Sequence, residues 1–408
     1  MNRLPAFPTY LGLSFASATA YQLSATINLV FQNEVAGLNP LQLVLVGSVL
    51  ELTVLLGEAP TGVLADLVSR RLSIVLGLAL VGVGLAIQAV PFFPVILLAQ
   101  VIWGLGYTFT SGATEAWLVD EVGMAHATGA LLRGGQAAAA GALVGAPTAA
   151  ALAMFSLQLP LLAAGAIMLA LVGVLALVMP ERGFPRSGLH REGGSAFRAG
   201  LVAGITVVRT RPGLGFLLIS FLLAGAASEG FDRLWVTHLL VVGLPPLGPL
   251  PPVAWWGAIE MAAILGGLVA LEAVRRFSLA GERTGTAVML AIQAAIVVAI
   301  AFFALSGNFA LAVVAYLPLR ALRRLLGPVQ TAWLAPRLPA EVRATGFSIF
   351  GQADAAGQIA GGPLLGVFGL VATVRAALVG SAVLLAMALP LYPLAGRGDA
   401  EPVRLSRP

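Results

Sequence analysis

The residues best suited to chemistry in this sequence are charged side chains that stand inside long apolar stretches. The densest group is Glu229, Asp232 and Arg233, within Ser-Glu-Gly-Phe-Asp-Arg-Leu-Trp over 228–235. Spacings of three and four residues place these side chains on one face of a helix. A carboxylate in apolar surroundings holds a proton more readily than one in water, and ionisable groups at membrane depth are usually functional. We therefore expect these three residues to take part in proton coupling; a static ion pair is the structural alternative.

Composition indicates what kind of chain must hold these charges. Of 408 residues, 59% are hydrophobic and 10% are charged, and the mean hydropathy is +0.96. Soluble domains have about 45–50% apolar and about 25% charged residues, so a soluble enzyme, a disordered chain and a collagen-like fibre are excluded. Long apolar runs favour an all-α membrane protein over a β-barrel. We predict twelve transmembrane helices, at about 8–32, 41–66, 73–91, 95–120, 131–155, 160–180, 213–242, 252–274, 285–305, 309–335, 345–370 and 373–396.

The longest polar interval divides these runs into two sets of six. It covers 181–211 and is predicted to be a cytoplasmic linker. The N-terminal six-helix bundle is then 1–180, and the C-terminal bundle with a short cytoplasmic tail is 212–408. Twelve spans put both termini on one side, and most loop arginines gather on that side. The positive-inside rule places both termini in the cytoplasm.

Metals, cofactors and nucleic acid are not expected as partners. Cysteine is absent, and His126, His190 and His238 do not have metal-ligand spacing. A Walker A pattern is also missing, so this chain is not expected to couple directly to ATP. The net charge of +5 comes from arginines in short loops, which favours membrane orientation over nucleic-acid binding.

An internal repeat supports the division into two halves. Gly-Gln-Ala-Ala-Ala-Ala-Gly-Ala-Leu-Val-Gly-Ala-Pro over 135–147 matches 351–363 at eight of thirteen positions, 216 residues later. Ala-Trp-Leu over 116–118 recurs at 332–334 with the same offset. Because six helices separate the copies, both would have the same orientation. Two parallel six-helix repeats with a site between them are typical of secondary transporters.

The segment Gly-Val-Leu-Ala-Asp-Leu-Val-Ser-Arg-Arg over 62–71 resembles motif A of the major facilitator superfamily. It keeps the glycine, aspartate and arginine of that motif, but Leu67 replaces its first basic residue and Ser69 its second glycine. The resemblance implies a cytoplasmic latch that biases the outward-open state. We expect Arg70 to pair with Asp120 or Glu121, at the end of the fourth run. The residues assigned to this latch are Gly62, Asp66, Arg70, Arg71 and Asp120.

A second motif resembles motif C of the antiporter branch of the same superfamily. It consists of Gly141, Gly145 and Pro147 in the fifth run, where small residues are expected to pack against the eighth run. Stretches such as Trp-Gly-Leu-Gly-Tyr-Thr-Phe over 103–109 resemble bacterial drug-efflux proteins of the multidrug and tetracycline type. One departure is Gln100, which stands where motif B of the family has an arginine, so coupling must be organised elsewhere.

Further candidate residues lie in both halves. Steps of three and four give the first run a polar stripe that is expected to line a cavity, with helix-to-helix hydrogen bonding as the alternative. Asp354 is expected to neutralise an arginine of the tenth run. Glu51 is a candidate proton carrier, and Glu58, Glu115 and Arg133 are assigned to a cytoplasmic gate. The cavity and substrate candidates are Ser17, Tyr21, Ser24, Asn28, Tyr107, Arg320 and Asp354.

Together these features predict a secondary active transporter in a bacterial cytoplasmic (inner) membrane. The expected activity is proton-coupled efflux of small amphipathic or drug-like molecules, and the expected partners are that substrate, protons and the lipid bilayer. The alternative is import or export of one native metabolite. A membrane enzyme acting on lipid would need a metal motif or a nucleophile constellation, and the sequence has neither. We expect a monomer.

Overall fold

The computed structural model describes residues 5–184, 212–275, 282–338 and 343–397. In these ranges the regular structure is helical, apart from one isolated bridge between Leu247 and Leu250. Ten of the described helical segments are long and apolar enough to cross a membrane. The predicted class, an all-α membrane protein, is therefore confirmed. The remaining two long helices are the most polar: α1 carries the polar stripe, and α12 has Arg320, Arg323 and Arg324 within two turns.

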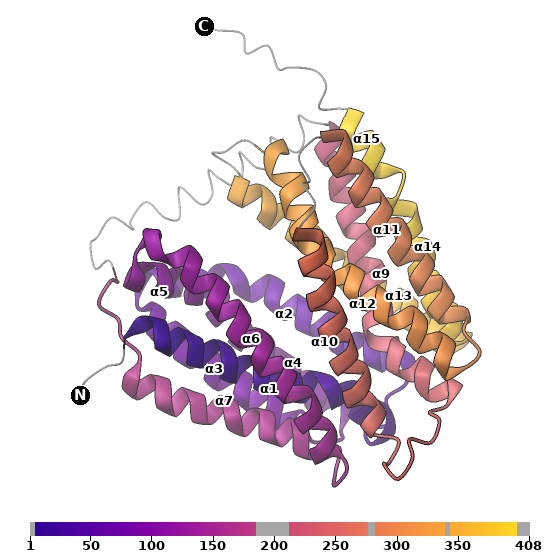
Figure 1. Ribbon diagram of the computed structural model, residues 1–408, viewed down its shortest axis with the longest axis horizontal. Helices are drawn as coiled ribbons and strands as arrows, with labels where there is room; N and C mark the ends of the chain where they lie inside the picture. The colour runs from indigo at the N-terminus through magenta and orange to yellow at the C-terminus, as the bar shows by residue number, and fades with distance from the viewer. Residues whose placement is uncertain (1–4, 185–211, 276–281, 339–342, 398–408) are drawn as a thin grey trace, which may run out of the picture. The chain divides into compact units, whose positions relative to one another are not determined.

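The chain forms two compact units, each described here by itself. Unit 1 comprises Met1–Gly188 and Gly243–Ile264, and unit 2 comprises Leu189–Val242 and Leu265–Pro408. Most of the predicted linker, 185–211, lies outside the described residues, so the proposed domain boundaries stay predictions. The helices of unit 1 are α1 (Ala6–Glu34), α2 (Pro40–Leu67), α3 (Arg70–Ile87), α4 (Phe93–Thr110), α5 (Ala113–Val122), α6 (Met124–Ala153), α7 (Leu159–Val178) and the first part of α10 (Ala254–Arg275) (Figure 1).

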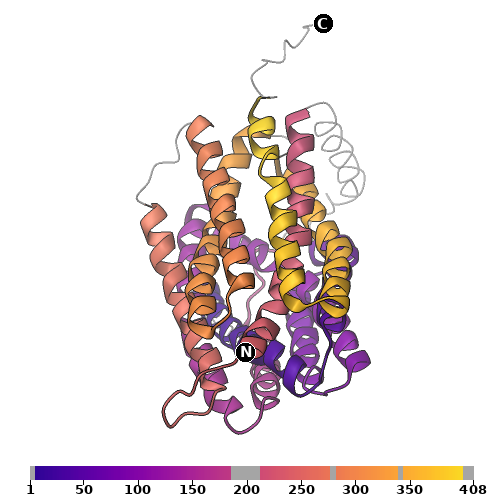
Figure 2. The same ribbon diagram turned by 90° about the vertical axis from the view of Figure 1, so that its right-hand side faces the viewer.

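Unit 2 is built from long helices that run side by side (Figures 1 and 2). In this unit α9 packs against α13 and α14, while α11 packs against α12 and α14. Its helices are α9 (Pro212–Val242), the last part of α10, α11 (Glu282–Leu305), α12 (Phe309–Leu334), the 3₁₀ turn η2 (Ala335–Arg337), α13 (Arg343–Val371), α14 (Val374–Ala388) and α15 (Leu391–Arg397).

Local sequence explains where several helices begin. Asn39 and Gln42 form a capping box at the start of α2, with Pro40 at the first helical position. The side chains of Ser69, Asn308 and Thr373 each accept a hydrogen bond from a backbone N–H in the first turn of α3, α12 and α14. These caps satisfy N–H groups that have no partner within the helix.

Two of the twelve predicted runs are each divided into two helices. The run 95–120 is interrupted between α4 and α5, where Gly112 has φ +70, and Gly123 has φ +80 beyond the far end of α5. Positive φ values are readily adopted by glycine alone, so both ends of α5 depend on these residues. The run 373–396 breaks between α14 and α15 at Pro390, which cannot donate a backbone hydrogen bond.

The repeated glycines make close helix contacts in both units. A Cβ atom added to Gly141 of α6 would lie 2.3 Å from the backbone oxygen of Phe15 in α1. At the matching position in α13, a Cβ on Gly357 would lie 2.0 Å from the backbone oxygen of Leu222 in α9. The two backbones in each of these helix pairs therefore lie too close together for any residue other than glycine.

The motif C glycines pack against α1, whereas alanines of the same helix make its expected contact with the eighth run. Gly141 and Gly145 face α1, where a Cβ on Gly145 would lie 2.8 Å from the backbone oxygen of Thr19. The eighth predicted run, α10, meets the other side of α6, because a Cβ on Gly257 would lie 2.5 Å from Ala150. Glycines four residues apart share one helix face, so they serve one neighbouring helix.

Candidate functional site

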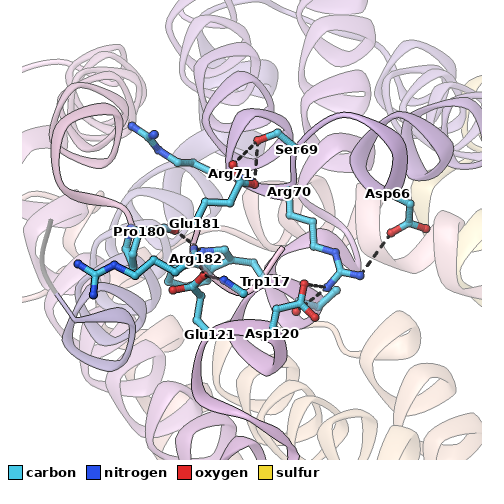
Figure 3. Close-up of polar contacts among 12 residues, drawn as sticks. Asp66, Ser69, Arg70, Arg71, Trp117, Asp120, Glu121, Pro180, Glu181 and Arg182 are labelled. Atoms are coloured by element: carbon cyan, nitrogen blue, oxygen red, sulfur yellow. Dashed lines mark hydrogen bonds and ion pairs between the residues drawn. The ribbon is translucent and has the colours of Figure 1, made fainter. Parts of the chain in front are cut away.

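Arg70 is the centre of a polar cluster at one end of unit 1 (Figure 3). It is the first residue of α3, and its guanidinium forms an ion pair with Asp120 of α5. The same group donates to the backbone oxygen of Ala116 at 2.8 Å and lies 3.7 Å from Asp66. Asp120 and Glu121 were the two expected partners of Arg70, and the ion pair forms with Asp120. The Arg70–Asp120 pair joins α3 to α5, whereas Asp66 is largely exposed.

Glu121, the other carboxylate, holds a different part of the chain. It accepts hydrogen bonds from the backbone N–H groups of Arg182 and Gly183, beyond the end of α7. The buried indole of Trp117 donates to the backbone oxygen of Pro180 at 2.7 Å. A Cβ on Gly183 would lie 2.1 Å from the backbone oxygen of Asp120. We call Pro180–Gly183 the exit segment; it is fastened to α5 by these contacts (Figure 3).

Glu181 of the exit segment caps the start of α3. Its two carboxylate oxygens each lie 2.8 Å from Ser69 Oγ, and one accepts from the backbone N–H of Arg71 at 3.0 Å. A carboxylate at a helix N-terminus is stabilised by the unpaired N–H groups and by the helix dipole. Ser69 therefore has a role of its own where the family motif has glycine. Sequence analysis missed Glu181, because it falls at the start of a polar interval with no pattern of its own.

We expect replacement of Glu181 by glutamine to lower the stability of unit 1 without unfolding it. The substituted amide keeps one acceptor oxygen but loses the charge at the α3 N-terminus, an effect of about 1 kcal/mol. The measurement is the thermal unfolding midpoint of the detergent-solubilised protein. Arg182→Gln is the matched control, because the Arg182 side chain is exposed and only its backbone makes the contact with Glu121. An equal loss of stability in both variants would contradict the capping role.

Helix α9 of unit 2 carries the carboxylates of two ion pairs that the structure describes. Arg233 Nε donates to Glu229 Oε1 at 2.8 Å, one turn apart on α9. Asp232, on the same helix, is held by both terminal nitrogens of Arg323 in α12, with Nη2 to Oδ2 at 2.7 Å. This two-pronged geometry is the strongest that an arginine makes with a carboxylate. Arg323 is not among the site residues predicted from the sequence.

The two pairs differ in their exposure. The Glu229 side chain is 3% exposed, whereas Asp232 and Arg323 are 36% and 27% exposed. Asp232 stands ten residues from the nearer end of a 31-residue helix. The Asp232–Arg323 pair therefore lies well inside the length of an apolar helix rather than at its end. Of the two carboxylates, Asp232 is the more exposed and Glu229 is the more shielded.

Aromatic side chains flank this second pair. The Arg323 guanidinium carbon lies 5.8 Å from the Phe231 ring centroid, and that of Arg320 lies 5.8 Å from the ring centroid of Tyr316. Tyr316 in turn stacks on Trp235 at 4.4 Å. Cation–aromatic contacts of this kind stabilise a guanidinium away from bulk water.

Asp354 has a hydrogen bond within its own helix, and its expected neutralisation of an arginine in the tenth run stays a prediction. It accepts a hydrogen bond from Gln358 at 2.9 Å, and among the described residues it forms no ion pair with an arginine of α12. One arginine of α12, Arg323, is engaged by Asp232. The two hydrogen bonds to Asp232 orient the Arg323 guanidinium toward α9.

The assignment of Glu58, Glu115 and Arg133 to a cytoplasmic gate stays a prediction. Glu58, Glu115 and Arg133 are exposed, and within the described part of the chain none of them forms an ion pair. Arg133 lies over the Phe7 ring, 5.7 Å from its centroid. Glu51 is half-buried in α2 and has interactions of its own.

The neutral cavity candidates gather on α1 and α4. Tyr21 contacts Trp103 with their ring centroids 6.3 Å apart, and Tyr107 is 45% exposed on α4. Ser24 and Asn28 are almost fully buried, and Ser17 Oγ is buried without a hydrogen-bond partner in the described residues. No cluster of three potential metal-binding side chains occurs among the residues the structure describes.

Comparison with known proteins identifies the family of this chain. The model of the Major Facilitator Superfamily matches residues 9–322. No curated protein matches the sequence. Among solved structures, the nucleoside transporter NupG is 14% identical with a TM-score of 0.78, over 96% of this chain and 99% of that one.

Two further solved structures show the same fold. A bacterial homologue of the human lysosomal transporter Spinster, in an inward-facing and occupied conformation, is 15% identical, with a TM-score of 0.72 over 98% of this chain and 100% of that one. A POT family transporter in complex with 5-aminolevulinic acid is 13% identical, with a TM-score of 0.70 over 97% and 96%. At these identities the likeness concerns the fold alone. With its helical membrane fold and a family match that covers most of its length, the chain belongs to the Major Facilitator Superfamily and is a multi-pass membrane transporter.

Proposed function

We propose that this protein is a proton-coupled secondary transporter that exports small amphipathic or drug-like molecules by alternating access. The proposal includes twelve transmembrane helices in two parallel six-helix repeats. It also includes a monomer in a bacterial inner membrane with both termini in the cytoplasm. The observation that carries it is the accessible Asp232–Arg323 pair in unit 2. A titratable carboxylate that lies at membrane depth and pairs with an arginine of another helix is suited to proton coupling.

The chemistry follows from what a proton does to this pair. Ionised Asp232 holds Arg323 through two charge-assisted hydrogen bonds. Protonation removes the charge of Asp232, so the hold on Arg323 weakens and α9 and α12 lose their connection at this point. A difference in proton affinity between two conformations is sufficient to drive a population shift. Proton binding at Asp232 is thereby coupled to helix movement.

Glu229 and Arg233 supply a second site for the same proton. They lie on α9 close to Asp232, but the Glu229 side chain is the more deeply buried of the two carboxylates. We expect a proton to reach the more exposed Asp232 first. Movement of α9 against α12 would then expose Glu229. In this way, proton uptake at Asp232 and proton release from Glu229 would be separate steps.

A second candidate function is transport of one native metabolite. It is favoured by the contact of Gly141 and Gly145 with α1, because their role in helix packing explains these glycines without any antiporter function. The expected ion coupling at Asp232 is the same for both candidates. They differ in the range of molecules that are moved and in the direction of movement.

Dye accumulation in cells tests the proposed function. A host without its main efflux pumps would express the wild type or Glu229→Gln, with and without a protonophore. We expect the wild type to lower dye accumulation several-fold, and expect this effect to need both Glu229 and the proton gradient. Higher accumulation than in empty cells would indicate uptake. No change across a broad panel of dyes and antibiotics would contradict drug export and favour the metabolite candidate.

Asp66→Asn is expected to slow turnover more than it weakens binding. Asp66 is exposed and only 3.7 Å from Arg70, so it acts on the Arg70–Asp120 pair rather than on a ligand. We expect kcat for dye transport to fall about tenfold with KM changed less than twofold, because a latch alters conformational exchange. Initial rates in proteoliposomes would measure both constants. A rise in KM at unchanged kcat would remove Asp66 from the latch.

A further inference from the structure

Four amide side chains form a buried relay across three helices of unit 1. Asn28 and Gln32 belong to α1, Gln88 is the residue at the C-terminal end of α3, and Gln100 lies in α4. Gln100 Nε2 donates to Gln88 Oε1 at 2.6 Å, and Gln88 Nε2 donates to Asn28 Oδ1. Gln32 Nε2 donates to the same Asn28 oxygen at 2.9 Å. The relay explains the amide at position 100, where motif B of the family has an arginine.

The relay fixes the orientation of the Asn28 amide. An amide has one acceptor side and one donor side, and two donors occupy the acceptor side of Asn28. Its Nδ2 has no acceptor within the described residues. Asn28 is 7% exposed, whereas Gln32, Gln88 and Gln100 are each 0% exposed. Asn28 is thus the one member of the relay that reaches an accessible surface, and its free side is a hydrogen-bond donor.

Aromatic side chains continue the same face. Tyr21 is seven residues before Asn28 on α1, and Trp103 is three residues after Gln100 on α4. Seven residues are about two turns, or roughly 10 Å along a helix. The Tyr21–Trp103 contact therefore lies on the same side of α1 as Asn28, two turns away. A flat molecule of ordinary drug size spans this distance.

We propose that Asn28 binds the transported molecule by donating a hydrogen bond to it, and that Gln32, Gln88 and Gln100 are positioning residues for Asn28. The inference rests on the proposed transport function. The ligand class it specifies is a small molecule with a flat apolar part for Tyr21 and Trp103 and an exposed hydrogen-bond acceptor, such as a carbonyl or ether oxygen. Because the relay is neutral, Asn28 contributes to selection by hydrogen bonding rather than by charge.

Transport kinetics with two probes test this assignment. Rhodamine 6G carries carbonyl and ether oxygens, whereas tetraphenylphosphonium has no hydrogen-bond acceptor. We expect Asn28→Leu and Gln100→Leu to raise KM for rhodamine 6G about tenfold with kcat changed less than twofold. KM for tetraphenylphosphonium should change less than twofold. Gln293→Leu is the matched control, since Gln293 is an equally buried amide that donates to Tyr392 in unit 2.

A pH profile separates positioning from mere packing. In Gln100→Glu, the substituted side chain can donate to Gln88 only when it is protonated. We therefore expect the KM defect for rhodamine 6G to be larger at pH 8 than at pH 6, beyond any change in the wild type. An equal KM rise for both probes, or the same rise in Gln293→Leu, would overturn the positioning role. Unchanged KM values in Asn28→Leu and Gln100→Leu would overturn it as well.

Cysteine labelling tests the inference even if neither probe is transported. The chain has no cysteine, so a single introduced thiol is the only reactive one. We expect a small methanethiosulfonate reagent to label Asn28→Cys in membranes and to leave Gln88→Cys unlabelled. An unreactive Asn28→Cys, or equal labelling of both, would overturn the inference. A wild type that transports neither probe would instead count against the proposed function, and the labelling would still decide the assignment of Asn28.

Discussion

Asp232→Asn is expected to abolish proton-driven transport while the protein stays folded. Asparagine has nearly the shape of aspartate and still accepts a hydrogen bond from Arg323, but it cannot take up a proton. We expect uphill dye transport in proteoliposomes with an imposed pH gradient to fall at least a hundredfold. Downhill exchange of dye, which needs no proton, should be retained in part. Glu34→Gln is the matched control, because Glu34 is an exposed carboxylate at the end of α1.

A double variant separates coupling from structural damage. Asp232→Asn leaves the Arg323 charge without its carboxylate, which can destabilise a partly buried site by several kcal/mol. Asp232→Asn combined with Arg323→Gln removes both charges, so we expect thermal stability to recover while proton-driven transport stays absent. Proton-driven transport at the wild-type rate in either variant would remove Asp232 from the coupling mechanism and leave Glu229 as the candidate.

Gly357→Leu is expected to prevent normal assembly of unit 2. A Cβ atom at this position would lie 2.0 Å from the backbone oxygen of Leu222, and a backbone cannot move aside as a side chain can. Helices α9 and α13 must separate, and overpacking of this kind typically destabilises by 1–3 kcal/mol or more. We expect loss of the single symmetric peak in fluorescence-detected size-exclusion chromatography. Gly141→Leu should do the same through α1 and α6.

The same repeat provides matched controls. Gly135 and Gly351 begin the two copies of the repeated segment, both are exposed, and a Cβ on either would meet nothing within 4 Å. Gly135→Leu and Gly351→Leu are therefore expected to behave like the wild type, or to be slightly more stable because leucine favours helix. Similar behaviour of all four variants would contradict the close helix contacts.

The helical membrane fold could be predicted from the sequence because it depends on local patterns of residues. The apolar runs and the glycine pattern within each copy of the repeat depend on residues close together in the chain. The pairing of Glu229 with Arg233 is local too, since they are one turn apart. Such features need only the helical period of 3.6 residues.

The parts that escaped prediction depend on contacts between distant residues. Arg323 meets Asp232 across 91 residues, and Glu181 meets Ser69 across 112. Gln100 looked like a missing arginine, and only its proximity to Gln88 and Asn28 shows that it belongs to an amide relay. The division between α4 and α5 was missed for another reason. Glycine is frequent throughout the chain, so Gly112 did not stand out until its positive φ was known.

The position of Glu181 in the chain has a consequence for biosynthesis. A ribosome adds roughly 5 to 20 residues per second, so Glu181 follows Ser69 by roughly 6 to 22 s. During that time the first N–H groups of α3 lack their carboxylate partner. The contacts of α5 with the exit segment cannot form either, because that segment follows α7 in the chain. The exit segment precedes α9 in the chain, so its contacts with α3 and α5 can form before the synthesis of α9 is complete. The cluster around Arg70 can thus be complete before the second set of helices enters the membrane. This order of assembly limits wrong pairing between helices of the two sets.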